Sequence, residues 1–246
     1  NGTVYINRIH IEEDAAKTII NSNENKVDFN RAGVPLIEIV TEPCIYSKEL
    51  AKEFVENLIL MFKYADICNG KLEEGSFRVD LNISLKEKNS KILGTRAEIK
   101  NLSSIKSLLK AIDAEVERQS QVLFLGESVI QETRGFNEKT GKTYSLRNKE
   151  NALGYRYIKD YNLNPIILEE NYINKIKKEI PIMPKEKKNF YIEKYNINSK
   201  YADILINNKA VSIFFDDCLE KYDNPKLISN VIINYLLKYI NNNIEK

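Results

Sequence analysis

Three consecutive acids form the densest group of possible metal ligands in this sequence. Glu12, Glu13 and Asp14 follow a residue run, 4–11, that reads as a β-strand, and His10, the one histidine of the chain, lies two residues before the first acid. Oxygen-rich groups suit Mg²⁺, which takes one or two carboxylates and leaves its other positions to water and phosphate. An acidic run is also typical of a solvated turn. The spacing alone therefore leaves a metal site and a turn both open.

A fourth carboxylate, Glu38, stands in the middle of the apolar run 35–40, Pro-Leu-Ile-Glu-Ile-Val. Apolar residues on both sides predict a strand that is covered on two faces. A carboxylate buried there costs several kcal/mol unless it pairs with a cation or binds a metal. A buried ion pair with Arg or Lys and a metal ligand are both compatible with this position.

Further charged side chains line the outer faces of two predicted hairpins. Residues 77–84 and 93–100 alternate strictly between apolar and polar, which is typical of half-buried strands. Their polar faces carry Arg78, Asp80, Asn82, Ser84, Arg96, Glu98 and Lys100. A second hairpin is expected to pair residues 129–134 with 143–149 across an Asn137–Gly141 turn. We expect these segments to meet in one antiparallel sheet, where Arg, Lys and metal would hold a phosphate, since no glycine-rich phosphate loop is present.

The elements that carry these residues fall into two regions of the 246-residue chain. Strand-like alternation dominates up to residue 165, interrupted by helical spacing over 48–65 and 104–125, and only helical spacing follows, up to a last helix over 227–244. An Asn-rich stretch ending in Asn-Pro, residues 161–165, has the composition of a linker. The sequence predicts an α+β protein: an antiparallel-sheet domain over 1–165 and a small all-helical domain over 166–246.

Composition excludes several classes of protein. A single histidine rules out a two-histidine zinc site within the chain, and three widely spaced cysteines offer neither a disulfide framework nor a CxxC metal motif. No run approaches the roughly 20 apolar residues of a membrane-spanning helix, so we expect no membrane partner. The net charge of +2 is too small to indicate a polyanion partner by itself.

Six motifs in collinear order carry a resemblance to a known family. They are residues 10–17 (HIEEDAAK), 28–43 (DFNRAGVPLIEIVTEP), 73–82 (EEGSFRVDLN), 94–102 (GTRAEIKNL), 131–134 (QETR) and 155–157 (YRY). In this order they resemble GatB, which is the B subunit of the glutamine-dependent aspartyl/glutamyl-tRNA(Asn/Gln) amidotransferase. The resemblance extends from about Val4 to the last helix. It implies a cradle-shaped sheet domain followed by a helical domain.

The resemblance also implies an activity, that of a carbon–nitrogen ligase which works only within a complex. Members of this family use ATP and Mg²⁺ to phosphorylate the side-chain carboxylate of Glu or Asp on a misacylated tRNA. Ammonia from a glutaminase, the amidase (A) subunit, then displaces the phosphate to give Gln-tRNA(Gln) or Asn-tRNA(Asn). The implied partners are misacylated tRNA, this amidase, and the small C subunit.

Site residues follow from the matched motifs. The resemblance implies that Glu13 and Glu38 are the catalytic metal ligands. It makes further residues of the same motifs candidates for nucleotide or acceptor-end contacts: Glu12, Asp14, Lys17, Arg31, Glu74, Arg78, Asp80, Arg96, Glu98 and Lys100. The family's Glu-x-His motif would precede this chain, and His10 is not its counterpart. The family's C-terminal tail domain would follow residue 246.

Two alternatives stay open at this point. A non-catalytic tRNA-binding or assembly module could share the fold, although it would not need Glu13 and Glu38 in their motifs. The sequence does not distinguish Glu-tRNA from Asp-tRNA as substrate. An Asn- and Lys-rich composition in this family suits a bacterial-type organelle, with a bacterial cytoplasm as the alternative.

Overall fold

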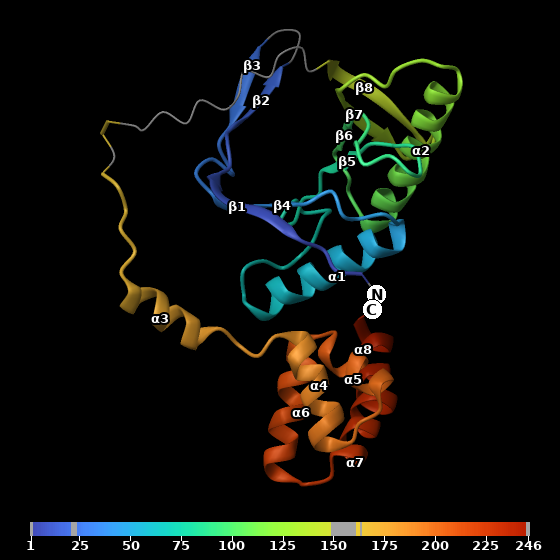
Figure 1. Ribbon diagram of the computed structural model, residues 1–246. Helices are drawn as coiled ribbons and strands as arrows, with labels where there is room; N and C mark the ends of the chain where they lie inside the picture. The colour runs from blue at the N-terminus through green and yellow to red at the C-terminus, as the bar shows by residue number, and fades with distance from the viewer. Residues whose placement is uncertain (1, 21–23, 149–160, 163, 245–246) are drawn as a thin grey trace. The chain divides into compact units, whose positions relative to one another are not determined.

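The computed structural model describes residues 2–20, 24–148, 161–162 and 164–244 (Figure 1). Helices and strands both contribute substantially, which confirms the predicted α+β class. By their internal contacts the residues divide into two compact units, Asn1–Phe54 and Val55–Lys246. The expected domain boundary near residue 165 stays a prediction. The YRY motif at 155–157 lies outside the described residues.

The first unit consists of two separate antiparallel strand pairs. Strand β1 (Ile6–Glu13) pairs with β4 (Pro35–Thr41), and β2 (Lys17–Ile20) pairs with β3 (Asn25–Asp28). Backbone hydrogen bonds from Asp14 N to Val34 O (2.8 Å) and from Gly33 N to Asp14 O (2.9 Å) continue the β1–β4 pairing into the turn before β4. Gly33 has φ +77°, a left-handed conformation that a glycine adopts without strain. These bonds fix the register of β1 against β4.

The second unit contains a four-stranded sheet in the order β5-β6-β7-β8. Its strands are β5 (Leu81–Ile83), β6 (Ala97–Lys100), β7 (Glu132–Asn137) and β8 (Lys142–Asn148). The two predicted hairpins are confirmed, as β5/β6 and β7/β8, although β5 and β6 are shorter than expected. The expectation of a single antiparallel sheet is wrong, because the strands of the described residues form three sheets and β6 pairs with β7 in parallel. Parallel strands need a long crossover, and helix α2 provides it.

Helix α2 (Ile105–Phe124) packs along one face of this sheet (Figure 1). It begins within its predicted range, after an N-cap serine, Ser104, whose hydroxyl accepts a hydrogen bond from Ser107 N (3.0 Å). It ends at Gly126, which has φ +75°. Helix α1 (Lys48–Tyr64) also matches its predicted range, although it spans the division between the two units.

A buried charged network joins α2 to strands β7 and β8. Glu115, which is 0% exposed, accepts hydrogen bonds from Arg118 Nη2 (2.6 Å), Gln119 Nε2 (2.8 Å) and Thr143 Oγ1 (2.8 Å). Arg134 Nε lies 3.4 Å from Glu115 Oε2, and Arg134 also pairs with buried Glu132. Burial favours a higher pKa for Glu115, but its hydrogen bonds to Arg118, Gln119 and Thr143 outweigh burial and lower the pKa below its usual value.

The remaining described residues from Glu170 onward form helices: α3 (Glu170–Glu179), α4 (Pro184–Tyr195), α5 (Ser199–Ile206), α6 (Lys209–Lys221), α7 (Pro225–Val231), the π-helical turn η1 (Ile232–Leu236) and α8 (Leu237–Ile244). Helices α4 to α7 and η1 share a core that includes Tyr191, Leu205, Phe215 and Ile232. Among the described residues no helix is both long and apolar enough to cross a membrane.

One polar group in this helical core gives a testable prediction. Tyr191 is 0% exposed, and its hydroxyl donates to Asp216 Oδ1 (2.7 Å) and lies 3.0 Å from Ser212 Oγ. Burial raises the pKa of this phenol, so the hydroxyl is a neutral donor at ordinary pH. We expect Tyr191→Phe to lower the free energy of unfolding by about 1–3 kcal/mol, because Ser212 and Asp216 lose a buried partner. Urea denaturation measures this change, and an unchanged unfolding midpoint would contradict it.

Candidate metal centre

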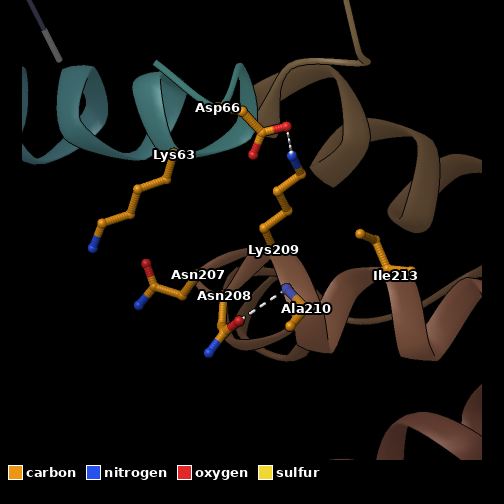
Figure 2. A pocket seen from close by; sticks show the side chains of 7 residues that line it. All are labelled: Lys63, Asp66, Asn207, Asn208, Lys209, Ala210 and Ile213. Carbon is orange, nitrogen blue, oxygen red and sulfur yellow. Dashed lines mark hydrogen bonds and ion pairs between the residues drawn. The ribbon is translucent and has the colours of Figure 1, made fainter. Parts of the chain in front are cut away.

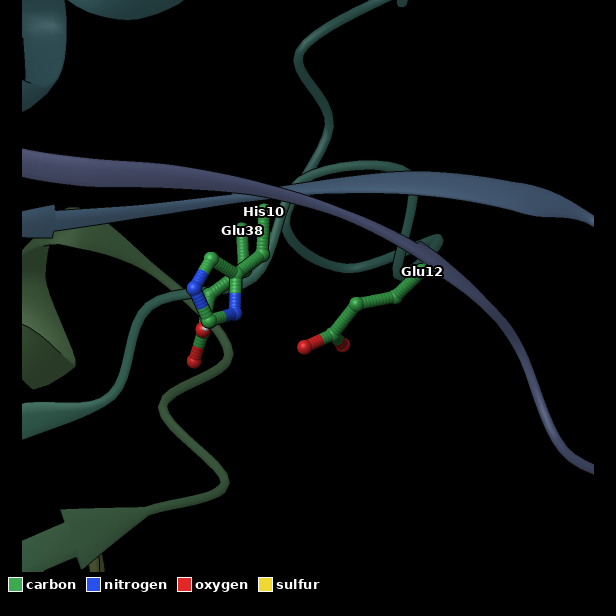
Figure 3. A group of neighbouring side chains, drawn as sticks. All are labelled: His10, Glu12 and Glu38. Atoms are coloured by element: carbon green, nitrogen blue, oxygen red, sulfur yellow. Dashed lines mark ion pairs between the residues drawn. The ribbon is translucent and has the colours of Figure 1, made fainter. Parts of the chain in front are cut away.

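The register of β1 against β4 brings three possible metal ligands onto one face. His10 is the cross-strand partner of Glu38, and Glu12 is the partner of Leu36. Directly opposed residues of an antiparallel pair project from the same face, and so do residues two apart on one strand. His10, Glu12 and Glu38 therefore point the same way from two neighbouring strands, as Figure 3 shows.

The three side chains converge closely enough to share an ion. One ligand atom from each of His10, Glu12 and Glu38 lies within 4.8 Å of the others. His10 Nδ1 lies 3.8 Å from Glu38 Oε2. Two ligands at about 2.1 Å on opposite sides of an ion are about 4.2 Å apart, so a small inward movement would close this group around one. In the described part of the chain, no Lys or Arg forms an ion pair with Glu12 or Glu38 to neutralise it in advance.

The ligand set fits a divalent cation. Two carboxylates supply the hard oxygen ligands that Mg²⁺ and Mn²⁺ prefer, and an imidazole nitrogen is a common ligand of Mn²⁺ and later transition metals. The group is half-buried at His10 and exposed at Glu12 and Glu38, which leaves room for water or a phosphate on the open side. The residues present could therefore hold an ion and keep part of its coordination shell available to a substrate.

Glu38 is less buried than its sequence predicts. Its side chain is 48% exposed, because β1 and β4 form a sheet of only two strands among the described residues. The desolvation cost that we expected from a strand covered on both faces is therefore small here. Convergence with His10 and Glu12, instead of burial, is what makes Glu38 a candidate ligand.

Glu13, the other expected ligand, lies elsewhere on β1. Its cross-strand partner is Pro35, and strand alternation directs its side chain to the face opposite His10 and Glu12. The structure thus brings Glu38 together with Glu12, which the sequence placed among the nucleotide or acceptor-end candidates. It does not bring Glu38 together with Glu13.

The other candidates of the first unit have structural partners. Arg31 Nε donates to Asp14 Oδ2 at 2.8 Å, so these two residues brace the turn between β3 and β4 against the end of β1. Lys17 opens β2 and is the cross-strand partner of Asp28. The pair of Asp14 and Arg31 therefore helps to keep β1 and β4 in register. Neither residue joins the group formed by His10, Glu12 and Glu38.

In the second unit the structure brings three candidates together on the four-stranded sheet. Lys100 Nζ lies 2.5 Å from Asp80 Oδ2 and 3.3 Å from Glu98 Oε1. Burial lowers the pKa of Lys100, but Asp80 and Glu98 outweigh this effect and raise it, so the ammonium stays charged. Thr133 Oγ1 also donates to Glu98 Oε2 at 3.1 Å. We name Asp80, Glu98, Lys100 and Thr133 the polar face of this sheet.

The remaining candidates do not belong to this group. Glu74 bonds to Lys71 Nζ (2.5 Å) and Asn69 Nδ2 (2.9 Å) within its own loop, and these bonds lower the pKa of its carboxyl. Arg78 and Arg96 are exposed. They stay candidates for contact with a polyanion.

An open pocket of about 440 Å³ has none of the candidate residues in its lining. It is lined by residues of α1, of the following turn, and of the start of α6, including Lys63, Asp66 and Lys209 (Figure 2). Lys209 Nζ pairs with Asp66 Oδ2 at 2.5 Å, and Asn208 caps α6 by accepting a hydrogen bond from Ala210 N (2.9 Å). These contacts account for the polar side chains as parts of the helical packing.

Sequence reasoning did not include His10 among the candidate ligands that the structure brings together. Part of the signal was available, because His10 and Glu12 are two residues apart. They share a face only because β1 continues past the predicted end at residue 11 to Glu13. What the sequence does not provide is the register that sets His10 opposite Glu38, because this depends on the turn that Asp14, Gly33 and Val34 close.

Comparisons with known proteins identify the family of this chain. Residues 1–174 match the model of the GatB/GatE catalytic domain family. The chain is 44% identical over 238 residues to a protein of Caldicellulosiruptor saccharolyticus named as the B subunit of aspartyl/glutamyl-tRNA(Asn/Gln) amidotransferase, covering 96% of this chain and 50% of that protein. Proteins of the same name from Persephonella marina (42% over 239 residues) and Rickettsia bellii (41% over 241) each match over 97% of this chain and 50% of their own length.

The relatives' name designates one subunit of an amidotransferase that is built from several different subunits. This chain spans about half the length of the curated relatives it matches. Because the family model covers most of the chain, the family itself is established, as the six motifs implied. The chain belongs to the GatB/GatE catalytic domain family.

Proposed function

We propose that this chain is a catalytic part of the B subunit of a tRNA-dependent amidotransferase. In this proposal the complete subunit uses ATP and Mg²⁺ to phosphorylate the side-chain carboxylate of Glu or Asp on misacylated tRNA. Ammonia from the glutaminase, which is the A subunit, then forms the amide, and the same complex includes the small C subunit. The observation that carries the proposal is the convergence of His10, Glu12 and Glu38 in a chain of this family.

The chemistry has two balanced steps. A carboxylate oxygen of the aminoacyl group attacks the terminal phosphorus of ATP, and ADP leaves. Ammonia then attacks the activated carbonyl carbon, and inorganic phosphate leaves with the electrons of the acyl–oxygen bond and takes up the proton that the ammonia loses. Phosphoryl transfer requires little covalent help from a protein, so the protein's task is to position the reactants and to neutralise charge.

This chain's own residues suit that task in a specific way. His10, Glu12 and Glu38 would hold a divalent cation, which when bound supplies positive charge to the transferring phosphoryl oxygens. Asp14 and Arg31 keep β1 and β4 in the register on which this set depends. In the second unit, Lys100 stays charged among Asp80 and Glu98, and could contact a nucleotide or an acceptor end.

The alternative function is a tRNA-binding or assembly module without catalysis. A module of that kind has no use for an imidazole and two carboxylates that point into one space. The arrangement of His10, Glu12 and Glu38 therefore favours the catalytic proposal.

The test is reconstitution of the complete complex with Glu-tRNA(Gln) and, separately, Asp-tRNA(Asn), in the presence of glutamine, ATP and Mg²⁺. We expect amide formation on at least one of the two tRNAs, with one ATP cleaved per amide formed. Omission of ATP or addition of a chelator should abolish the product. Binding of misacylated tRNA without ATP cleavage would instead support the non-catalytic module. Residence in a bacterial-type organelle is a further proposal that rests on composition and family alone.

A further inference from the structure

The polar face of the four-stranded sheet ends in an exposed aromatic ring, Tyr144, that none of the matched motifs includes. Tyr144 is the cross-strand partner of Gly135, and Gly135 is the partner of Lys100 on the next strand. Lys100 in turn bonds to Asp80 just before β5. A row of four residues thus crosses the sheet from β8 to β5.

This row lies on the face opposite α2. The neighbour of Tyr144 on the strand, Thr143, donates to Glu115 of α2, so alternation directs Tyr144 away from that helix. Likewise, Arg134 contacts Glu115, and Gly135 follows it on β7. The Tyr144 ring is therefore on the same face as Lys100, Glu98 and Thr133.

Gly135 makes room for the ring. A Cβ atom at residue 135 would lie 2.6 Å from both Cζ and Oη of Tyr144, a distance that real contacts do not allow. The outer end of the ring therefore rests over the backbone of β7, where any other residue would displace it. Tyr144 is still 47% exposed, so part of the ring is open to a ligand.

An aromatic ring held in place beside carboxylate acceptors and an ammonium is suited to a nucleotide base. Bases stack on aromatic side chains, and base amino groups or ribose hydroxyls donate to carboxylates such as Asp80 and Glu98. We propose that Tyr144 is the stacking residue for a nucleotide base that binds on the polar face. This inference rests on the proposed function, which offers two sources of the base: the adenine of ATP and a base at the acceptor end of tRNA.

The experiment compares Tyr144→Leu, Tyr144→Phe and Gly135→Ala in the complete subunit within its complex. Loss of one stacked base weakens binding by about 5- to 150-fold. We expect this loss for Tyr144→Leu, which removes the ring, and for Gly135→Ala, which displaces it, whereas Tyr144→Phe keeps wild-type affinity. Tyr222→Leu, at an exposed tyrosine after α6, is the matched control and should have no effect.

Two binding measurements separate the sources of the base. If the base belongs to ATP, Tyr144→Leu weakens ATP binding and leaves the binding of inorganic triphosphate unchanged. If it belongs to tRNA, ATP binding is unchanged and the KM for misacylated tRNA rises.

Wild-type affinity of Tyr144→Leu for both substrates would overturn the inference. It would also be overturned if Tyr144→Phe lost as much affinity as Tyr144→Leu, because the effect would then belong to the hydroxyl and not to the ring. A wild-type complex that neither cleaves ATP nor amidates tRNA would refute the proposed function itself.

Discussion

Glu12→Gln and Glu38→Gln, each introduced alone into the complete subunit within its complex, are expected to lower ATP-dependent amidation by about 100-fold or more. Each change removes one of two anionic ligands from the group formed with His10. A bound cation would stabilise the charge of the transferring phosphoryl group by several kcal/mol. This stabilisation is lost if the site no longer retains the cation. Glutaminase activity, which we assign to the partner subunit, should continue unchanged.

A matched control comes from the next residue of the same strand. Glu13→Gln makes the same chemical change on the opposite face of β1, so the structure predicts a much smaller loss than for Glu12→Gln. The six-motif resemblance predicts the reverse, because it places the ligand at Glu13. Titration of Mn²⁺ by electron paramagnetic resonance provides a readout independent of turnover. Unaltered Mn²⁺ binding in both Glu12→Gln and Glu38→Gln would remove the metal centre from this face.

The second large effect concerns folding stability. We expect Glu115→Ala to lower the free energy of unfolding by about 3–5 kcal/mol, because it leaves the buried Arg134 and the partly buried Arg118 without the carboxylate that they share. It also leaves the Thr143 hydroxyl without its acceptor on α2. Urea denaturation followed by circular dichroism measures the loss.

Glu117→Ala is the control for this prediction. Glu117 is exposed on the same helix, two residues further along, and bonds only to Gln121 among the described residues (3.3 Å). Its replacement should change stability by less than about 0.5 kcal/mol. Equal unfolding midpoints for the two variants would mean that the buried network does not stabilise the sheet.

Much of the local structure was predictable from the sequence. Helices α1 and α2 followed from apolar residues at helical spacing. The two hairpins followed from strict alternation. The pairing between hairpins was not predictable, because nothing local to β6 or β7 specifies a parallel neighbour. That pairing depends on α2 burying Glu115 against Thr143 and Arg134.

The candidate site was predictable by residue type but not by partner. Burial was expected for Glu38 and exposure is found, whereas the matched motifs make Glu38 a candidate ligand independently of burial. Whether Glu12 or Glu13 shares a face with Glu38 depends on a register difference of one residue. Strand alternation places the side chains of these two consecutive residues on opposite faces of β1. Residue identity shows which side chains are able to bind a metal, and only cross-strand pairing shows which of them meet.

The parallel seam between β6 and β7 also affects the order in which this sheet can assemble. The hairpins β5/β6 and β7/β8 close the shorter loops of this sheet and can form quickly. Pairing of β6 with β7 must instead close a longer loop that contains all of α2. Completion of the sheet is thus a late, non-local step that occurs together with docking of the helix. Until then the inner edges of both hairpins expose unpaired backbone groups, and the nascent chain is most prone to aggregate during this interval.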